Sequence, residues 1–377
     1  MLKRQMLIAL AVLPLISCKQ IEISTVQPVQ LVQDILSGND PAAASILKAS
    51  AKQEPDRNIT IFGDPQRCLA LRNAFLSVDD FDNVDGRLVP DRLPDFCGER
   101  FAVTMDVACV PYKRYTDGAQ EDSLRELAVR AVLSSLDTVC FISPYDKEGL
   151  GRKMRSKLII LESAFMGAFG HYDADSLLRA SGCHVHVLTP FGTMLEQVSD
   201  AHPGKGINVG VIAERSSLAA GAYSACLKNL VRSRHLPASE CIAFPRNRDG
   251  EVLTGFLDKY AAAGYNKPLD AILVDDFDTD VEELEMTLAR IRSILGEESF
   301  TYGRLLSPDI RILDARKTLT RKCFRIFREE NLFTHKILFP KADHYITAKN
   351  GMFPPFVTVN YSPRYMPSKF EDIDVQD

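Results

Sequence analysis

The sequence predicts an α/β protein of two doubly wound, Rossmann-like lobes with mainly parallel sheets and a cleft between the lobes. Three observations lead to this prediction. Short apolar strands alternate with helices of roughly 10–15 residues, which is typical of parallel sheets covered by helices. A break at 200–206 gathers His, Pro and two Gly between stronger elements. The chain of 377 residues also exceeds the usual size of one domain.

The second half of the chain carries the clearer pattern. Apolar runs predict strands at 207–212, 240–244, 270–274 and 310–313, and periodic segments predict helices at 217–231, 252–263, 280–295 and 316–329. The helix at 280–295 has Glu282 and Glu283 in its first turn, at the positive N-terminal end of the helix dipole, and Gly296 follows its last turn. These residues indicate where that helix begins and ends.

The first half is less regular. Strands are predicted at 59–62, 101–107, 138–142 and 183–188, and helices at 66–76, 122–136 and 173–181. Residues 151–169 allow either a strand or a helix, and the spacing of their apolar side chains favours a helix. The tail has a strand-like run at 356–359 among prolines.

These elements predict five consecutive parts of the chain. They are a signal peptide with a lipidation site at 1–18, a tether at 19–57, a first lobe at 58–203, a second lobe at 204–335 and a tail packing on the lobes at 336–377. The tether is expected to be polar with a helical turn or two, and the folded body is expected to begin near Asn58.

The first 18 residues indicate export. Lys3 and Arg4 precede an apolar run at 6–16, which is shorter than the ~20 residues of a membrane-spanning helix. The following Leu15-Ile16-Ser17-Cys18 resembles the lipobox of bacterial lipoproteins. That resemblance implies that Cys18 is lipidated and anchors the chain to a membrane of the bacterial cell envelope, on its periplasmic or surface face. A plain cleaved signal with a fortuitous cysteine is the alternative.

Charge and cysteine usage exclude several classes. A net charge of −5 with scattered Lys and Arg argues against a nucleic-acid binder. Cysteines other than Cys18 are widely spaced and form no CxxC pair, which argues against a disulfide-dense scaffold, a thioredoxin-like motif and a zinc ribbon. Buried thiols are expected, and disulfide pairing is left open.

Common catalytic and cofactor motifs are absent from the sequence. There is no GxSxG, P-loop, HExxH or strand-linked GxGxxG, so no cofactor is expected. His184 and His186 supply two of the three or four ligands that a metal site needs, and the acidic loop 275–280 lacks the Gly and Glu of a calcium loop. No metal is therefore predicted.

Ligand-binding candidates lie where predicted strands end, because open α/β sheets bind ligands at the carboxyl ends of their strands. They are Asp64 and Arg67 in the first lobe, and Arg215, Ser216, Ser217, Asp275 and Asp276 in the second. A long loop at 83–99 adds Arg87 and Asp95, together with Asp91, Arg92 and Glu99. Helix capping and ordinary turns are the alternative roles for these residues.

The two-lobe pattern resembles the periplasmic-binding-protein-like fold at the level of architecture only. The leading hypothesis is therefore a membrane-anchored protein without catalytic residues that binds a small polar ligand between its lobes. A cell-envelope enzyme on the same scaffold, an isomerase or a hydrolase, is the first alternative, with Cys140, Asp146 and Asp276 as candidates. The second is an envelope protein that binds another protein through the loop at 83–99 and its tail.

Overall fold

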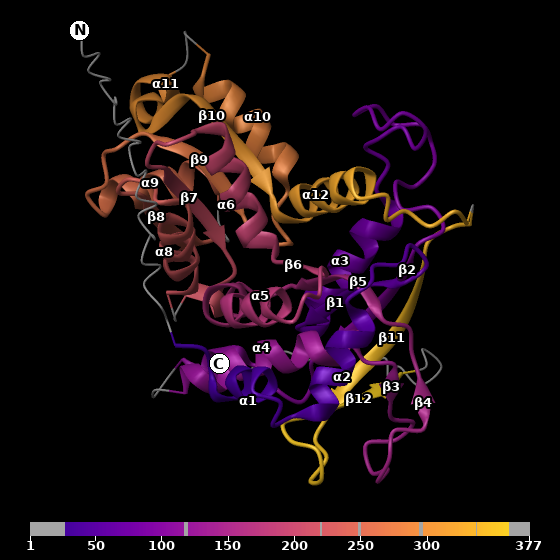
Figure 1. The fold of residues 1–377 in the computed structure, drawn as a ribbon. Coiled ribbons are helices and arrows are strands. Elements are labelled where there is room, and N and C mark those ends of the chain that lie inside the picture. Colours follow the sequence, from indigo (N-terminus) through magenta and orange to yellow (C-terminus); the bar gives the residue numbers. More distant parts are fainter. Residues whose placement is uncertain are drawn as a thin grey trace, which may run out of the picture.

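The computed structural model describes residues 27–116, 120–218, 221–247, 250–293, 297–336 and 338–361. The chain forms two α/β lobes, each built on a mainly parallel sheet, which confirms the predicted fold class (Figure 1). The predicted signal peptide, the lipobox and Cys18 lie outside the described residues. Within these residues, no helix is both long and apolar enough to cross a membrane.

The sheet of the first lobe has the strand order β12-β11-β2-β1-β5-β6. Its strands are β1 (Asn58–Gly63), β2 (Arg100–Met105), β5 (Ser156–Leu161), β6 (His186–Leu188), β11 (Lys341–Ala348) and β12 (Val357–Asn360). All neighbours are parallel except β11 and β12. Every residue of β1 and β5 is buried, as expected of central strands that helices cover on both faces.

The helix predicted over 151–169 is wrong, because this segment supplies the central strand β5. Its run Leu158–Leu161 is aliphatic on both faces, and such a run fits a doubly covered parallel strand as well as a buried helix. The strand predicted at 138–142 shrinks to β3 (Val139–Cys140), which pairs with β4 (Gly151–Arg152) outside the main sheet.

The sheet of the second lobe follows the prediction closely. Its order is β10-β9-β7-β8, and all neighbours are parallel. The strands are β7 (Asn208–Ala213), β8 (Glu240–Pro245), β9 (Leu269–Val274) and β10 (Leu306–Asp314). The expected helix at 280–295 is α10 (Val281–Ile291), and Asp280 caps it by accepting hydrogen bonds from the amides of Glu282 and Glu283.

Helices cover both sheets and join them. Around the first sheet lie α3 (Pro65–Ser77), η1 (Tyr112–Tyr115), α4 (Glu121–Leu136), η2 (Met166–Gly170) and α5 (His171–Ala180). Around the second lie α7 (Arg215–Leu218), α8 (Ala222–Arg234), α9 (Val252–Ala262), α11 (Glu297–Tyr302) and η3 (Gly303–Leu305). Two further helices, α6 (Pro190–Ala201) and α12 (Ala315–Glu329), pack on each other between the lobes (Figure 1).

The predicted tether at 19–57 is folded over most of its described length. It contains α1 (Gln30–Leu36) and α2 (Pro41–Ser50), and Val32 and Leu47 are fully buried in the core. Its apolar side chains are few, but two short helices suffice to bury them against α4 and α5. The folded body therefore begins well before Asn58, and the predicted tail contributes β11 and β12 to the first sheet.

Candidate functional site

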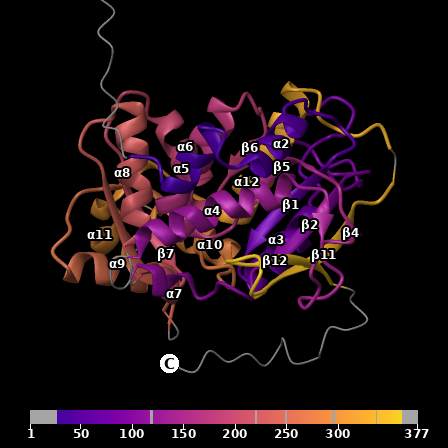
Figure 2. The same cartoon turned by 60° about the horizontal axis from the view of Figure 1, so that its bottom comes forward.

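Four carboxylates meet where the two lobes face each other. Asp64 follows β1, Glu162 follows β5, Glu214 follows β7 and Asp275 follows β9. Because these strands are central in parallel sheets, their carboxyl ends lie at one edge of each sheet. Figure 2 shows the two lobes side by side, with β7 and α7 in the second and β1 and α3 in the first.

Arg67, in the first turn of α3, links the two lobes. Its Nε lies 2.6 Å from Oε2 of Glu162 in its own lobe. In the other lobe, its Nη2 lies 2.9 Å from Oδ1 of Asp275, and its Nη1 donates to the backbone oxygen of Asp275 at 2.8 Å. The same Nη1 lies 3.4 Å from Oε2 of Glu214. The ring of Phe277 covers the guanidinium at 4.0 Å.

Glu162 is the most enclosed carboxylate, with none of its side chain exposed. Its Oε1 accepts a hydrogen bond from the amide of Asp64 at 2.7 Å. Gly63, with φ at +152°, leaves room for it, since a Cβ there would lie 2.3 Å from Cγ of Glu162. Asp64 itself caps α3 by accepting from the amides of Gln66 and Arg67. Local backbone geometry thus fixes the Glu162 carboxyl against Arg67.

Burial raises the pKa of Glu162 to about 8, although Arg67 and the Asp64 amide favour its charged form. Three carboxylates contact the guanidinium of Arg67, and two of them, Glu162 and Asp275, are buried. Burial therefore favours the protonated form of Glu162.

Asp275 is held from both lobes. Its Oδ2 accepts a hydrogen bond from the hydroxyl of Tyr223 at 2.8 Å, while Oδ1 faces Arg67. Tyr223 lies on α8 and packs edge-on against Phe191 of α6. The buried carboxylate thus has a fixed orientation, and it approaches the guanidinium from the side of the second lobe.

The structure brings together only some of the predicted ligand residues. Arg67 and Asp275 meet as described, and Asp64 lies beside them as a helix cap. Asp276 turns away to Arg246, at 3.5 Å. Ser217 is buried, whereas Arg215 is exposed, and the side chain of Ser216 lies outside the described set.

The loop at 83–99 is separate from this cluster. Asp95 accepts hydrogen bonds from the amides of Asp80 and Phe81, and Arg87 is 81% exposed beside Asp85. The loop packs on the far half of α12, where Arg328 donates to the backbone oxygen of Val84. Its acidic side chains close turns on their own backbone, which accounts for their abundance.

Three further predicted candidates of this region also have structural roles. Asp91 accepts a hydrogen bond from the amide of Asn83, and the amide of Arg92 donates to Asp79. Glu99 forms a buried ion pair with Lys157 at 2.6 Å. The hydrogen bonds and ion pair of Arg87 and Asp95 do not involve Arg67, so the structure does not place these two predicted ligand residues in the carboxylate cluster.

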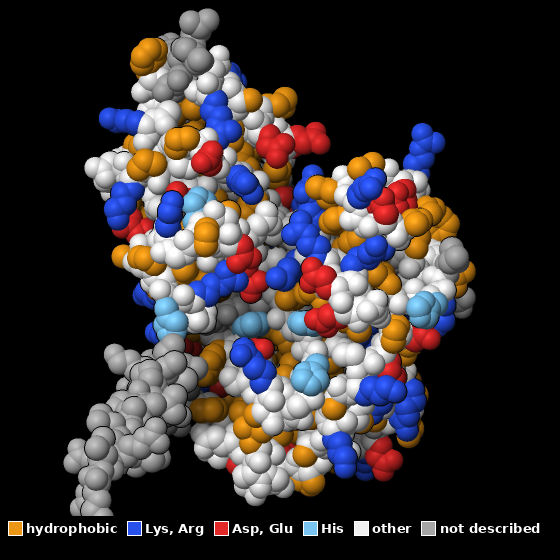
Figure 3. Space-filling view, turned by 45° about the horizontal axis from the view of Figure 1, so that its top comes forward, with side chains coloured by type: hydrophobic (Ala, Val, Ile, Leu, Met, Phe, Trp, Pro, Cys, Tyr) orange, Lys and Arg blue, Asp and Glu red, His pale blue; other side chains and the backbone are white. Residues whose placement is uncertain are grey.

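Charged side chains also gather on the face where α12 lies between the lobes (Figure 3). Arg321 pairs with Asp80 at 2.7 Å, and Lys322 of α12 pairs with Glu196 of α6 at 3.3 Å. These pairs tie α12 to its neighbours on both sides. Much of the basic charge of this helix is thus matched within the chain.

The enzyme candidates taken from the sequence lie elsewhere. Cys140 is buried in β3, and burial raises the pKa of its thiol, which disfavours a reactive thiolate. Asp146 accepts a hydrogen bond from the amide of Ser143 in an outer loop. His186 pairs with Glu330 at 2.7 Å. Among the described residues, no cluster of His, Cys, Asp and Glu is arranged to hold a metal ion.

Three residues of the site, Glu162, Glu214 and Tyr223, are not among the candidates that the sequence pattern predicts. Glu162 follows a segment interpreted as a helix, so it was not recognised as the end of a strand. Glu214 does follow a predicted strand, but the ligand-binding candidates after that strand are Arg215, Ser216 and Ser217. Tyr223 contributes through the packing of α8 on α6, which no local pattern reveals.

No protein-family model matches the chain, and no curated protein matches it. Among solved structures, it is similar to the glutamate racemase of Francisella tularensis in complex with D-glutamate, at 14% identity over 80% of this chain and 91% of that chain, with a TM-score of 0.46. The chain is also similar to a glutamate racemase isoform from Bacillus anthracis, at 13% identity over 78% of this chain and 90% of that chain, with a TM-score of 0.45. A third similar structure is the glutamate racemase of Campylobacter jejuni, at 14% identity over 78% of this chain and 93% of that chain, with a TM-score of 0.40.

The prediction of a binding-protein-like ligand binder is wrong. Arg67 and Asp275, which were expected to hold a polar ligand, hold each other across the lobes. A sequence pattern places charges at strand ends, but it does not show that two of them form a pair.

Proposed function

We propose that the chain is an enzyme of the isomerase class, which moves a proton on a small carboxylate-bearing substrate between its two lobes. One observation carries the proposal: Glu162 and Asp275, from opposite lobes, approach the same guanidinium, and Glu162 has a pKa of about 8. This takes up the enzyme alternative, with a different set of residues from Cys140, Asp146 and Asp276.

Arg67 suggests the substrate class. Guanidinium groups bind carboxylates through paired, charge-assisted hydrogen bonds. Of its three carboxylate partners, Glu214 makes the longest contact, at 3.4 Å, and its side chain is 42% exposed. A substrate carboxylate that displaces Glu214 would gain a buried cation. The substrate would then lie between Glu162 and Asp275.

The two buried carboxyl groups suit proton transfer. As bases, carboxylates remove a proton from the carbon next to the substrate carboxylate, and as acids they return one from the other side. Arg67 would stabilise the negative charge that develops on the substrate in between. Because Glu162 and Asp275 are buried, the lobes must part to admit a substrate, and the partly exposed Glu214 contact is the place where this begins.

Hydrogen exchange in heavy water tests this proposal. The folded full chain is incubated in D₂O with α-amino and α-hydroxy acids, including both enantiomers of glutamate and aspartate. We expect loss of the α-proton NMR signal for at least one acid, together with loss of optical activity. The urea-unfolded chain is the control. A folded chain that exchanges no α-proton across the panel would contradict the proposal.

We also propose that the chain is attached to a membrane of the bacterial envelope through a lipid on Cys18. The lipobox-like Leu15–Cys18 supports this, and several acyl chains would suffice for firm anchoring. Expressed in a bacterial host, the natural chain should sediment with membranes, and Cys18→Ser should move it to the soluble fraction. Cys97→Ser is the control. A Cys18→Ser chain that stays with the membranes contradicts the anchor.

A further inference from the structure

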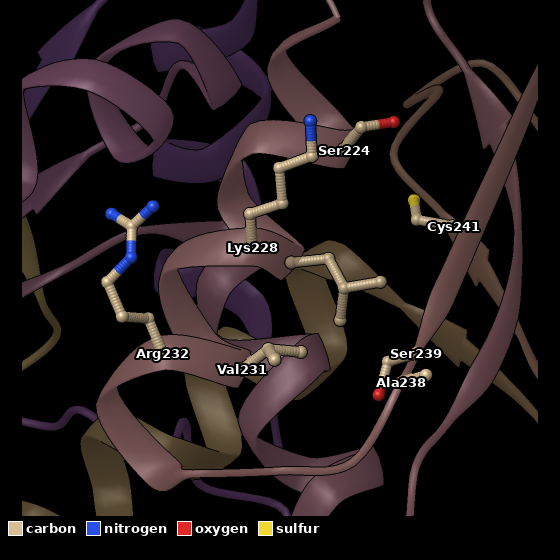
Figure 4. A pocket seen from close by; sticks show the side chains of 8 residues that line it. Ser224, Lys228, Val231, Arg232, Ala238, Ser239 and Cys241 are labelled. Atoms are coloured by element: carbon tan, nitrogen blue, oxygen red, sulfur yellow. The ribbon is translucent and has the colours of Figure 1, made fainter.

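The second lobe has a groove of its own, away from Arg67. It lies between α8 and the edge of β8 and has a volume of about 570 Å³ (Figure 4). Small-molecule sites usually have volumes of roughly 300–1,000 Å³. The groove is therefore large enough for a ligand, and no residue of the carboxylate cluster lines it.

The groove arises from the sheet topology. Strand β8 is the last strand of the second sheet and pairs only with β7 among the described strands. Helix α8 packs on β8 from one side. No described strand continues the sheet past β8, so the space beside the helix remains open along this edge.

The lining combines an apolar floor with a basic rim. Leu227, Val231, Ala238 and Cys241 form the floor, and Ser224 and Ser239 add hydroxyl groups. Burial raises the pKa of the Cys241 thiol to about 12, so this side chain is neutral at physiological pH. No Asp or Glu belongs to the lining.

Lys228 and Arg232 form the rim. They lie four residues apart on α8, so they share one face of the helix, and Figure 4 shows both on the helix side of the groove. Within the described part of the chain neither makes an ion pair, whereas Arg234 of the same helix pairs with Asp200. Two cations beside an apolar floor, with no Asp or Glu among the lining residues, favour a ligand that is negative at one end and apolar at the other.

We propose that this groove binds a single-chain amphiphile with an anionic head group, of which a fatty acid is the simplest example. The head group lies against Lys228 and Arg232, and the chain covers Leu227, Val231 and Cys241. This site is independent of the proposed proton transfer between the lobes.

Calorimetric titration of the full chain with dodecanoate tests the site. We expect saturable binding, and Lys228→Gln with Arg232→Gln should weaken it by about tenfold or more. Val231→Phe keeps both cations but fills the floor, and it should weaken binding as well. Lys205→Gln with Arg325→Gln removes one lysine and one arginine outside the groove, and it should leave the affinity unchanged.

Other ligands decide what the groove recognises. Butyrate, which has the head without the long chain, and dodecyltrimethylammonium, which has the chain with the opposite charge, should both bind more weakly than dodecanoate. Equal affinity for either would overturn the proposal, as would the absence of dodecanoate binding. Binding to anionic phospholipid vesicles without binding to free dodecanoate would also overturn it, because the surface would then be a membrane contact.

Discussion

Replacing Arg67 with alanine is expected to lower the free energy of unfolding by about 3–5 kcal/mol, which is the usual cost of leaving a buried charge without its partner. The side chain of Arg67 is 11% exposed, and it is the cation closest to Glu162 and Asp275. Without it, two buried carboxylates from different lobes face each other. Urea unfolding at neutral pH, followed by far-ultraviolet circular dichroism, measures the loss.

The loss should shrink when the pH falls from about 7 to about 5, because buried carboxylates without a cation have raised pKa values. A carboxyl group whose pKa is higher in the folded chain than in the unfolded chain stabilises the fold at a pH below its unfolded-state pKa. That stabilisation is lost as the pH rises through its folded-state pKa. Glu214→Gln, which removes the partly exposed contact of Arg67, is the matched control and should cost less than about 1 kcal/mol. An Arg67→Ala chain as stable as Glu214→Gln at both pH values would show that the cluster does not hold the lobes together.

The second lobe was predictable because its local signals agree with its fold. In α10, the cap Asp280, the acidic first turn and the buried Leu284 and Leu288 all indicate the same helix. Its strands are short apolar runs separated by such helices, and this order alone indicates a parallel sheet. Little in this lobe depends on distant parts of the chain.

The first lobe depends on distant partners, and local patterns therefore mislead. In β5, Lys157 is an unusual residue for a central strand, yet it is fully buried because Glu99 and the backbone oxygens of Pro55 and Leu332 surround its amine. These partners are far from Lys157 in the sequence. A helix predicted over 151–169 hides the end of β5, so Glu162 is not recognised as a residue at a strand end and is absent from the predicted site.

Changing Glu162 to glutamine is expected to reduce proton exchange on the substrate by about 10²–10⁴-fold, the usual contribution of a general acid or base. Glutamine keeps the size of the side chain and an acceptor for the Asp64 amide, but it cannot take up or release a proton near neutral pH. The rate of α-proton exchange in D₂O measures the effect. Asp95→Asn is the control, since Asp95 is also buried, with a pKa raised to about 6, but lies outside the lobe junction. It should retain the exchange rate.

The same variant tests whether Glu162 titrates in the folded chain. Its pKa is raised from 4.5 to about 8, so the folded state holds the proton more tightly, and the stability gained from it declines as the pH rises between these values. The slope amounts to at most about 1.4 kcal/mol per pH unit for one proton. Glu162→Gln should flatten the dependence of the unfolding free energy on pH up to about pH 8, whereas Asp95→Asn should flatten this dependence only up to about pH 6. A Glu162→Gln chain with the natural slope and the natural exchange rate would show that Glu162 is a permanently charged partner of Arg67, and the acid–base role would then pass to another group.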